Sequence, residues 1–263
     1  MKILPKKSLG QNFLIDENIL NIITELGNIN NEDLVLEVGP GTGNLTQKIL
    51  EKKPKNFTVI EKDKKLVDFL KKKFNKKIDI INEDMLKFSY EKNLNKRIIV
   101  FGNLPYNIST QILSKWIKIK KLENFYKKFI LMFQKEVADR IIAETNDKQY
   151  GRLSILSSWR MHIKKIKEIS PNSFYPPPKV KSTILLFEPK INYFKIENPK
   201  NLEYLTNVFF NQKRKMVNKP LKILFKNINE VSKKLKINLN DRPQNISPLV
   251  YFKLCQEYER LLK

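Results

Sequence analysis

Apolar and polar residues alternate along the first part of the chain with two different periods. Short apolar runs of strand length cover residues 33–38, 56–60, 78–82, 97–103 and 129–133. Apolar residues at helical spacing cover 17–26, 63–74, 109–120 and 134–143. Asp16 is the expected N-cap of the first helix, and Gly27 is the expected C′ residue after it. Strands that alternate with helices predict an α/β fold, a Rossmann-like doubly wound sheet.

The pattern changes toward the C-terminus. Residues 161–169 and 180–187 alternate like a closing antiparallel pair of strands around a proline-rich loop. Beyond Pro189 helical periodicity dominates, over residues 202–210, 219–225, 228–235 and 248–262. We therefore predict an α/β domain over 1–189, followed by a small all-helical domain over 190–263.

Glycines concentrate directly after the first predicted strand. The loop reads Gly39-Pro40-Gly41-Thr42-Gly43-Asn44, and the chain has only seven glycines in all. Glycine permits positive φ and a close approach of the backbone to a ligand, so a strand, a glycine loop and a helix in this order favour a bound nucleotide. A dinucleotide is disfavoured, because its fingerprint needs a third glycine where this chain has Asn44.

Acidic residues lie at the ends of the first three predicted strands. Glu37 precedes the glycine loop, Glu61 ends the second strand, and Asp84 with Met85 follows the third. A carboxylate at Glu37 repels a pyrophosphate and attracts an ammonium group. Glu61 can accept hydrogen bonds from ribose hydroxyls, and Asp84 can accept one from an adenine amino group. These positions favour S-adenosylmethionine, which carries an ammonium, a ribose and an adenine.

The fourth predicted strand ends in Asn103-Leu104-Pro105-Tyr106. An amide, a proline-fixed backbone and an aromatic ring can offer hydrogen-bond acceptors and a stacking face to a flat ring that carries an amine. The motif favours a nucleobase held by its exocyclic amine. An ordinary strand-ending turn is the alternative interpretation of the same residues.

Several motifs together resemble the bacterial small-subunit (16S) ribosomal RNA adenine N6,N6-dimethyltransferases, a class I S-adenosylmethionine-dependent family. They lie at residues 7–14, 37–43, 103–106, 173–180, 210–215 and 242–247, and so span nearly the whole chain. The resemblance implies a methyltransferase sheet and dimethylation of N6 of two adjacent adenosines near the 3′ end of small-subunit ribosomal RNA. It also implies that this RNA and the immature small ribosomal subunit are partners, and that the helical domain binds them.

The resemblance further implies a set of site residues. Those expected to bind the cofactor are Gln11, Asn12, Leu14, Glu37, Gly39, Gly41, Gly43, Glu61, Asp84, Met85 and Asn103. Those expected to be catalytic are Asn103, Leu104, Pro105, Tyr106 and Phe174. The assignment of Asn12 depends on the resemblance alone.

The expected mechanism centres on the target amine. The Asn103 side-chain oxygen and the Leu104 carbonyl each accept one N6 hydrogen, which aims the nitrogen lone pair at the methyl sulfonium. Tyr106 stacks on the base and Phe174 covers its other face, with core packing as the alternative for Phe174. No general base is required, because the nitrogen can lose its proton after methylation. Orientation and charge placement supply most of the rate.

The charge of the chain suits a polyanionic partner. Lys and Arg number 51 against 27 Asp and Glu, a net charge of +24. Such a charge predicts steep salt dependence of RNA binding. Lys, Asn and Ile are all abundant, a pattern that an AT-rich genome imposes whatever the partner. Both explanations therefore contribute to the excess of lysine.

The remaining composition argues against other chemistries. One cysteine and one histidine, Cys255 and His162, predict neither a disulfide framework nor a metal site. No apolar run has the roughly 20 residues that span a bilayer, and the N-terminus lacks the features of a signal peptide. We expect a cytoplasmic protein that contacts no membrane and acts as a monomer.

Two rival functions remain open at this point. The chain could be an RNA-binding or ribosome-assembly factor without enzymatic activity, or a methyltransferase of DNA adenine or of large-subunit RNA. The intact motif at 103–106 disfavours the first, and the compact helical tail disfavours a DNA-reading module. The sequence leaves open whether free RNA or an assembled particle is the substrate.

Overall fold

The computed structural model describes residues 4–6, 10–88 and 97–263, and the chain divides into two compact units. The first unit contains the chain up to residue 138 together with 162–189, and the second contains 139–161 and 190–263. Residues 139–161, which the sequence pattern assigned to the α/β domain, therefore belong to the second unit. In the described part of the chain, no helix combines the length and apolarity needed to cross a membrane.

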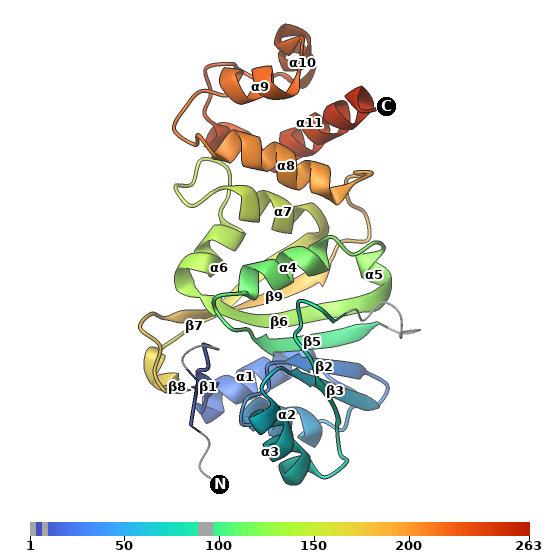
Figure 1. Ribbon diagram of the computed structural model, residues 1–263, viewed down its shortest axis with the longest axis vertical. Helices are drawn as coiled ribbons and strands as arrows, with labels where there is room; N and C mark the ends of the chain where they lie inside the picture. Colours follow the sequence, from blue (N-terminus) through green and yellow to red (C-terminus); the bar gives the residue numbers. More distant parts are fainter. Residues whose placement is uncertain (1–3, 7–9, 89–96) are drawn as a thin grey trace. The chain divides into compact units, whose positions relative to one another are not determined.

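Within the described residues, the main sheet of the first unit has seven strands (Figure 1). Their order across the sheet is β4 (Asp79–Asn82), β3 (Asn56–Glu61), β2 (Leu34–Val38), β5 (Ile98–Asn103), β6 (Tyr126–Gln134), β9 (Ser182–Pro189) and β7 (Met161–Ile169). The first five strands are parallel, and β9 runs antiparallel to β6. This confirms the predicted α/β fold.

The chain reverses its direction of travel across the sheet between β2 and β5. It moves outward from β2 to β3 and β4, and it then returns to place β5 on the other side of β2. The connections after β2 and β5 lead to opposite faces of the sheet, which leaves a crevice at the carboxyl ends of these strands. The polar residues that end β2, β3 and β5 therefore converge on one edge of the sheet.

Helices cover both faces of the sheet because its central strands are apolar on both sides. On one face, strand residues such as Val35 and Phe101 form a core with α1 (Glu17–Gly27), α2 (Asn44–Glu51) and α3 (Lys64–Phe74). On the other face, Trp116 of α4 (Ser109–Ile117) packs against Phe129 of β6, with ring centroids 5.1 Å apart. The short helices α5 (Leu122–Phe125) and α6 (Lys135–Ile142) flank β6 along the chain.

Helix α1 begins as predicted and ends differently. The Asp16 side chain accepts hydrogen bonds from the backbone N–H groups of Asn18 and Ile19, which confirms it as the N-cap. The left-handed residue at the other end is Asn28, with φ 44°, and Gly27 is the last helical residue. Gly27 is required for packing, because a Cβ there would lie 2.6 Å from the Phe101 ring. The prediction of Gly27 as the C′ residue was therefore wrong.

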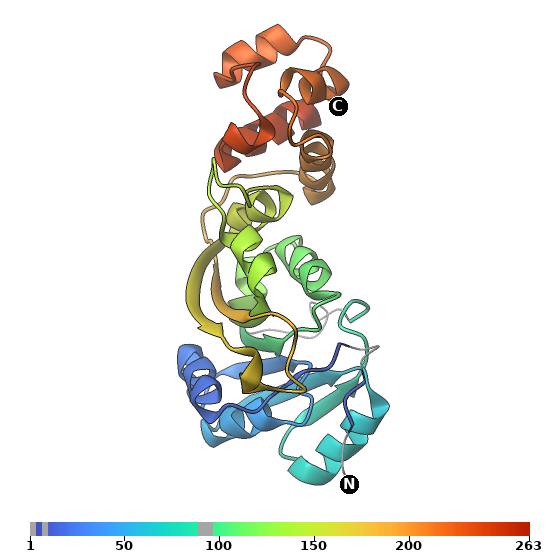
Figure 2. The same ribbon diagram turned by 90° about the vertical axis from the view of Figure 1, so that its left-hand side faces the viewer.

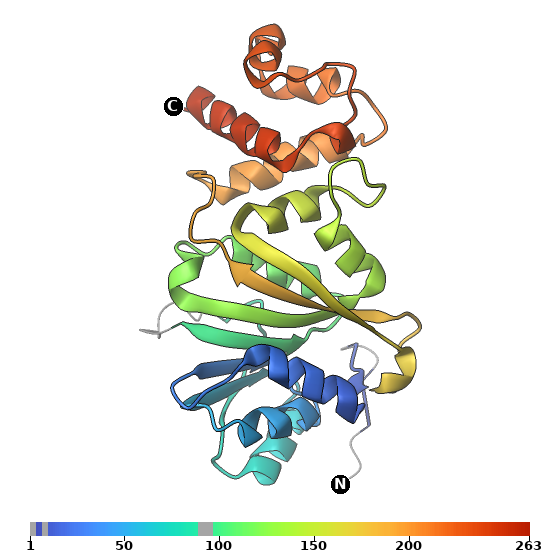
Figure 3. The same cartoon turned by 180° about the vertical axis from the view of Figure 1, so that it is seen from behind.

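A two-stranded antiparallel sheet joins the N-terminal region to a distant part of the chain. Strand β1 (Phe13–Leu14), blue in Figure 3, pairs with β8 (Phe174–Tyr175), which is yellow. In this pairing Leu14 lies opposite Phe174. The short helix η2 (Pro171–Ser173) precedes β8, and the Ser173 hydroxyl donates to Asp16 at 2.8 Å. This pairing holds residues 13 and 14 close to the carboxyl ends of the parallel strands.

The second unit is helical, with α8 to α11 drawn in orange to red in Figure 2. Its elements are α7 (Arg152–Arg160), α8 (Pro199–Phe210), α9 (Asn218–Leu224), α10 (Ile228–Leu235), η3 (Pro243–Asn245) and α11 (Pro248–Leu261). The predicted helices agree with α8 to α11. Helix α7 was not predicted, because buried serines such as Ser154 and Ser157 interrupt its apolar pattern. It packs against α8 and α11, which explains why it belongs to this unit.

Candidate functional site

A cavity of about 190 Å³ lies at the carboxyl ends of the parallel strands in the first unit. Its lining includes the polar residues at the ends of β2, β3 and β5, together with residues from the loop after β4 and from the segment 10–14. The predicted site residues that line it are Gln11, Asn12, Leu14, Glu37, Gly39, Gly41, Glu61, Asp84, Met85, Asn103, Leu104, Pro105 and Tyr106. The structure therefore brings together almost every residue that the sequence pattern selected.

The three glycines of the loop have different roles. All have a positive φ, 70° at Gly39, 59° at Gly41 and 76° at Gly43. A Cβ on Gly41 would lie 2.6 Å from the Phe13 ring, so this glycine lets β1 approach the loop. Gly43 does not line the cavity. It is the N-cap residue of α2, and a Cβ there would lie 2.6 Å from the Phe74 ring, so packing alone already requires a glycine at this position. The cofactor contact of Gly43 stays a prediction.

Glu37 is a buried carboxylic acid at the end of β2. Its side chain is 2% exposed, and Thr46 Oγ1 donates to its Oε2 at 2.6 Å. The pKa of Glu37 is raised to about 8, mainly because the group is buried. The nearby carboxylate of Glu61 adds to this rise, whereas the Thr46 hydrogen bond and the charge of Lys73 oppose it. A cationic group placed in the cavity would relieve this unfavourable desolvation.

Glu61 ends β3 and is also buried. Its Oε1 accepts a hydrogen bond from the backbone N–H of Asp63 at 2.8 Å. Burial raises the pKa of Glu61, and hydrogen bonds from the backbone N–H groups of Asp63, Gly41 and Lys62 partly offset that effect. These bonds hold the carboxyl group at the floor of the cavity and connect it to the glycine loop.

Asp84 follows β4 and remains a charged acceptor. Lys62 Nζ lies 2.8 Å from its Oδ2, and the Leu86 N–H donates to its Oδ1 at 3.0 Å. The hydrogen bond from Lys62 is the main reason why the pKa of Asp84 is lowered. Lys115 of α4 holds this loop in place, because its Nζ donates to the Leu86 carbonyl at 2.9 Å.

The side-chain amide of Asn103 has a defined orientation. Its Nδ2 donates to the Asn12 carbonyl oxygen at 2.7 Å. A carbonyl can only accept, so the nitrogen faces Asn12 and Oδ1 is left to accept from a ligand. Tyr106, which also lines the cavity, is tied by its hydroxyl to the Ser182 hydroxyl of β9 at 2.6 Å. Burial raises the pKa of Tyr106, so its hydroxyl stays protonated near neutral pH.

Phe174 lies outside this arrangement. It does not line the cavity, its side chain is 2% exposed, and it packs in the core with Leu14 and Leu20 on the α1 side of the sheet. The prediction that Phe174 covers one face of the target base is therefore not supported by the structure. Phe174 points into the core because β8 pairs with β1 and successive residues of a strand point to opposite sides. The next residue, Tyr175, is therefore exposed.

Three polar residues of the site were not predicted. Thr46 lies in the first turn of α2, Asp63 is the N-cap of α3, and Lys115 lies on α4. Asp63 could have been recognised as a helix cap from its position before an amphipathic stretch. Nothing in the local pattern could have shown that Thr46 and Lys115 reach Glu37 and the loop after β4.

Comparison with known proteins identifies close similarities. Residues 4–260 match the family model described as ribosomal RNA adenine dimethylase. The chain is 56% identical to a protein of Pelagibacter ubique named ribosomal RNA small subunit methyltransferase A, with 97% of each chain covered. A Malacoplasma penetrans protein of the same name is 42% identical, covering 98% of this chain and 93% of its own.

Two solved structures are similar in fold. A crystal structure of a dimethyladenosine transferase from Plasmodium falciparum aligns with a TM-score of 0.81 and 27% identity, covering 94% of this chain and 98% of that one. The crystal structure of the 23S rRNA methyltransferase ErmE aligns with a TM-score of 0.69 and 20% identity, covering 94% of this chain and 100% of that one. The second similarity concerns the fold alone.

Proposed function

Because the chain belongs to the ribosomal RNA adenine dimethylase family and is a methyltransferase, we propose that it transfers methyl groups from S-adenosylmethionine to small-subunit ribosomal RNA. The acceptors are N6 of two adjacent adenosines near the 3′ end, and each is methylated twice. The observation that carries the proposal is the Asn103 amide, held at the cavity with an oxygen that no donor among the described residues occupies, so that it can accept from an adenine amine.

The lining of the cavity fits S-adenosylmethionine. Glu37 is a buried acid with a raised pKa and suits the ammonium of the cofactor, Glu61 suits its ribose, and Asp84 suits its adenine amine. When bound, the cofactor supplies an electrophilic methyl group on a positively charged sulfur. Gly39 lines the cavity without a side chain and leaves room for the cofactor, whereas the missing Cβ of Gly41 accommodates the Phe13 ring.

The protein's own groups orient the acceptor. In the first transfer, Asn103 Oδ1 and the Leu104 carbonyl accept the two N6 hydrogens, which removes the amine from conjugation with the ring and exposes its lone pair. In the second transfer, the methylated amine has one hydrogen left, which one of these two acceptors receives. The Tyr106 ring, anchored through Ser182, offers a stacking face to an adenine that has left its helix. No residue has to remove a proton before the attack, so the rate depends on orientation and on the charges around the amine.

The proposed partner is the immature small ribosomal subunit, so we expect the protein to act in the cytoplasm. The helical second unit is the proposed RNA-binding part. We expect the protein to act as a monomer.

A labelled-methyl assay tests the proposed function. Small subunits that lack the dimethyladenosines, the naked ribosomal RNA, large-subunit RNA and duplex DNA are offered to the same enzyme. We expect label to enter the small subunit or its RNA, and hydrolysis should recover it as dimethyladenosine. Label in DNA or in large-subunit RNA would favour another target, and binding to small subunits without any transfer would favour an assembly factor.

A further inference from the structure

Residues 10–14 form one wall of the cavity, and we call this segment the N-terminal wall. This segment lies far in sequence from the strand ends that form the rest of the cavity. The manner in which it is held therefore affects the geometry of the whole site.

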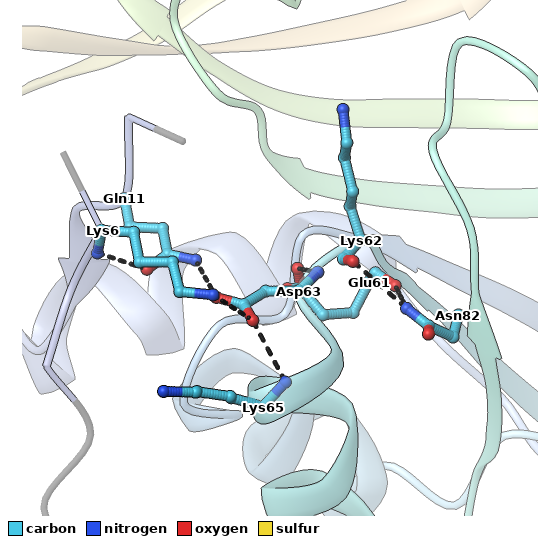
Figure 4. Close-up of polar contacts among 7 residues, drawn as sticks. All are labelled: Lys6, Gln11, Glu61, Lys62, Asp63, Lys65 and Asn82. Atoms are coloured by element: carbon cyan, nitrogen blue, oxygen red, sulfur yellow. Dashed lines mark hydrogen bonds and ion pairs between the residues drawn. The ribbon is translucent and has the colours of Figure 1, made fainter. Parts of the chain in front are cut away.

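The N-terminal wall is anchored on Asp63 (Figure 4). Lys6 Nζ donates to Asp63 Oδ1 at 2.8 Å, and Gln11 Nε2 donates to Asp63 Oδ2 at 3.1 Å. The Lys6 backbone N–H also donates to Gln11 Oε1 at 2.7 Å. Both oxygens of a single carboxylate thus hold side chains from the N-terminal region. The carboxylate is buried, with a side-chain exposure of 4%, against 42% for Lys6.

Asp63 is itself fixed at the end of β3. Its Oδ1 caps α3 by accepting from the Lys65 N–H at 3.1 Å, and its own N–H donates to Glu61. Burial alone would raise the pKa of Asp63, but hydrogen bonds from Lys6 and Gln11 lower it overall, so the group is ionised at neutral pH. Asp63 is therefore a rigid, charged point that connects the proposed ribose acceptor to the N-terminal wall.

The other end of this connection is the amide of Asn103. The Asn12 carbonyl that accepts from Asn103 Nδ2 belongs to the residue directly after Gln11. If the peptide at Asn12 moved, the amide would lose the acceptor that it has among the described residues, and either its oxygen or its nitrogen could then face the cavity. A nitrogen facing an adenine amine would repel it, because both groups are donors.

We propose that Asp63 is a positioning residue for Asn103. It holds Lys6 and Gln11, which fix the Asn12 carbonyl, and that carbonyl turns the Asn103 oxygen toward the acceptor amine. This inference rests on the proposed function, because it explains how the amine acceptor of that reaction is oriented.

The N-terminal wall has further anchors, so breaking the Asp63 contacts would loosen it without unfolding the unit. Asn44 Nδ2 donates to the Leu14 carbonyl at 2.8 Å, and β1 remains paired with β8. The expected consequence is a less well-ordered Asn103 amide within an otherwise intact site.

The test uses Lys6→Met, because Lys6 is half-exposed and lines no part of the cavity. At saturating S-adenosylmethionine, we expect the single-turnover rate on small-subunit RNA to fall about tenfold, since misplacement of a catalytic group mainly affects the chemical step. Cofactor affinity and melting temperature should stay close to wild type, and Lys6→Arg should restore most of the rate. The matched control is Lys48→Met, which removes the Lys48–Glu17 pair of 2.7 Å in the same unit and should leave the rate unchanged.

A second measurement does not depend on activity. In the wild-type protein, the Asn103 side-chain amide should give an NMR signal whose bonded proton exchanges slowly with solvent, and Lys6→Met and Asp63→Asn should both accelerate that exchange. Wild-type rates in both variants together with an unchanged Asn103 signal would overturn the inference. If the wild-type chain fails to methylate RNA, the proposed function fails, while the amide exchange still decides whether Asp63 positions Asn103.

Discussion

The two ends of the same parallel strands carry charge in opposite ways. At the carboxyl ends, Glu37 and Glu61 are 2% and 7% exposed, and both have a raised pKa. At the amino ends of β3 and β4, a second cavity of about 190 Å³ is lined by side chains that include four exposed lysines, Lys53, Lys55, Lys76 and Lys77. The carboxyl ends of β2 and β3 therefore carry buried acids, whereas the amino ends of β3 and β4 carry exposed lysines.

This difference in burial indicates that the charged groups at the carboxyl ends of the strands lower the stability of the fold, whereas those at the amino ends do not. A buried carboxyl group loses its hydration, and only a ligand or a hydrogen bond can compensate for that loss. An exposed lysine keeps its hydration, and a pair such as Lys55–Glu32 at 3.1 Å gains little from a nearby carboxylate. Substitutions at the carboxyl ends should therefore change function strongly, whereas those at the amino ends should change little.

The largest effect is expected from Asn103→Ala. Removing the amide should lower the single-turnover rate by about 100- to 1,000-fold, the scale for loss of one positioned hydrogen-bonding group in an active site. Cofactor affinity, measured by calorimetry, should stay within about twofold of wild type, because Glu37, Glu61 and Asp84 are unchanged. Asn56→Ala, at the amino end of β3, serves as the control and should keep the wild-type rate. Equal losses of rate and cofactor affinity would mean that Asn103 is structural.

Glu37 should release a proton when the cofactor binds. With a pKa of about 8, the free enzyme holds Glu37 mostly protonated at pH 7, and a cationic ligand favours the ionised form. Calorimetry at pH 7 in buffers of different ionisation enthalpy should detect release of close to one proton, and Glu37→Gln should abolish the release and weaken binding about 10- to 100-fold. Glu32→Gln at the opposite end should leave both quantities unchanged. Proton release that persists in Glu37→Gln would assign the proton to another group.

The same pKa predicts how the stability of the ligand-free protein varies with pH. The folded-state pKa of Glu37 is raised above its ordinary value of 4.5, so the contribution of Glu37 to stability is present below about pH 4.5 and is lost as pH rises toward 8. Denaturant unfolding of Glu37→Gln should therefore lack this decline, and the variant should gain stability relative to wild type at the upper end of that range.

A smaller effect is expected from Gly43→Ala. The residue has φ 76°, and a Cβ would lie 2.6 Å from the Phe74 ring, so the variant should lose about 1–3 kcal/mol of unfolding free energy. Gly151→Ala is the control, because φ there is 179° and a Cβ would meet Phe210 only at 3.7 Å. Denaturant unfolding of both variants checks the prediction, and equal stability of the two would contradict it.

The smallest effect is expected at the amino ends of the strands. Lys55→Met removes the exposed pair with Glu32, and the unfolding free energy should change by less than about 0.5 kcal/mol. Cofactor affinity should not change. A loss above about 1 kcal/mol would show that the two ends of the sheet differ less than their burial indicates.

Most of the fold could be predicted from the sequence, because its signals are local. The five parallel strands follow apolar runs, and Asp16 was identified as a cap from its position before an amphipathic stretch. Helix α7 escaped this reasoning, since its serines are buried by packing against α8 and α11. The end of α1 was misjudged because Gly27 accommodates the ring of Phe101, which lies on β5 and is distant in sequence.

The site shows the same division. Its acids, its glycines and the motif at 103–106 follow strand ends and could be found by position along the chain. Phe174 does not line the cavity, because the register of β8 against β1 decides which side of that strand faces the core. Asp63 and Thr46 were missed, because their partners lie on other elements.

The sequence by itself determined which strands form, where each one ends, and which polar groups stand at those ends, since all of these depend on neighbours within a few residues. Only the tertiary structure decided that the Asn12 carbonyl meets the amide of Asn103, that Asp63 holds the N-terminal wall, and that Glu37 is buried deeply enough to change its pKa. Hydrogen bonds between distant residues and the loss of hydration depend on what surrounds a group in space, and the order of residues does not encode that locally.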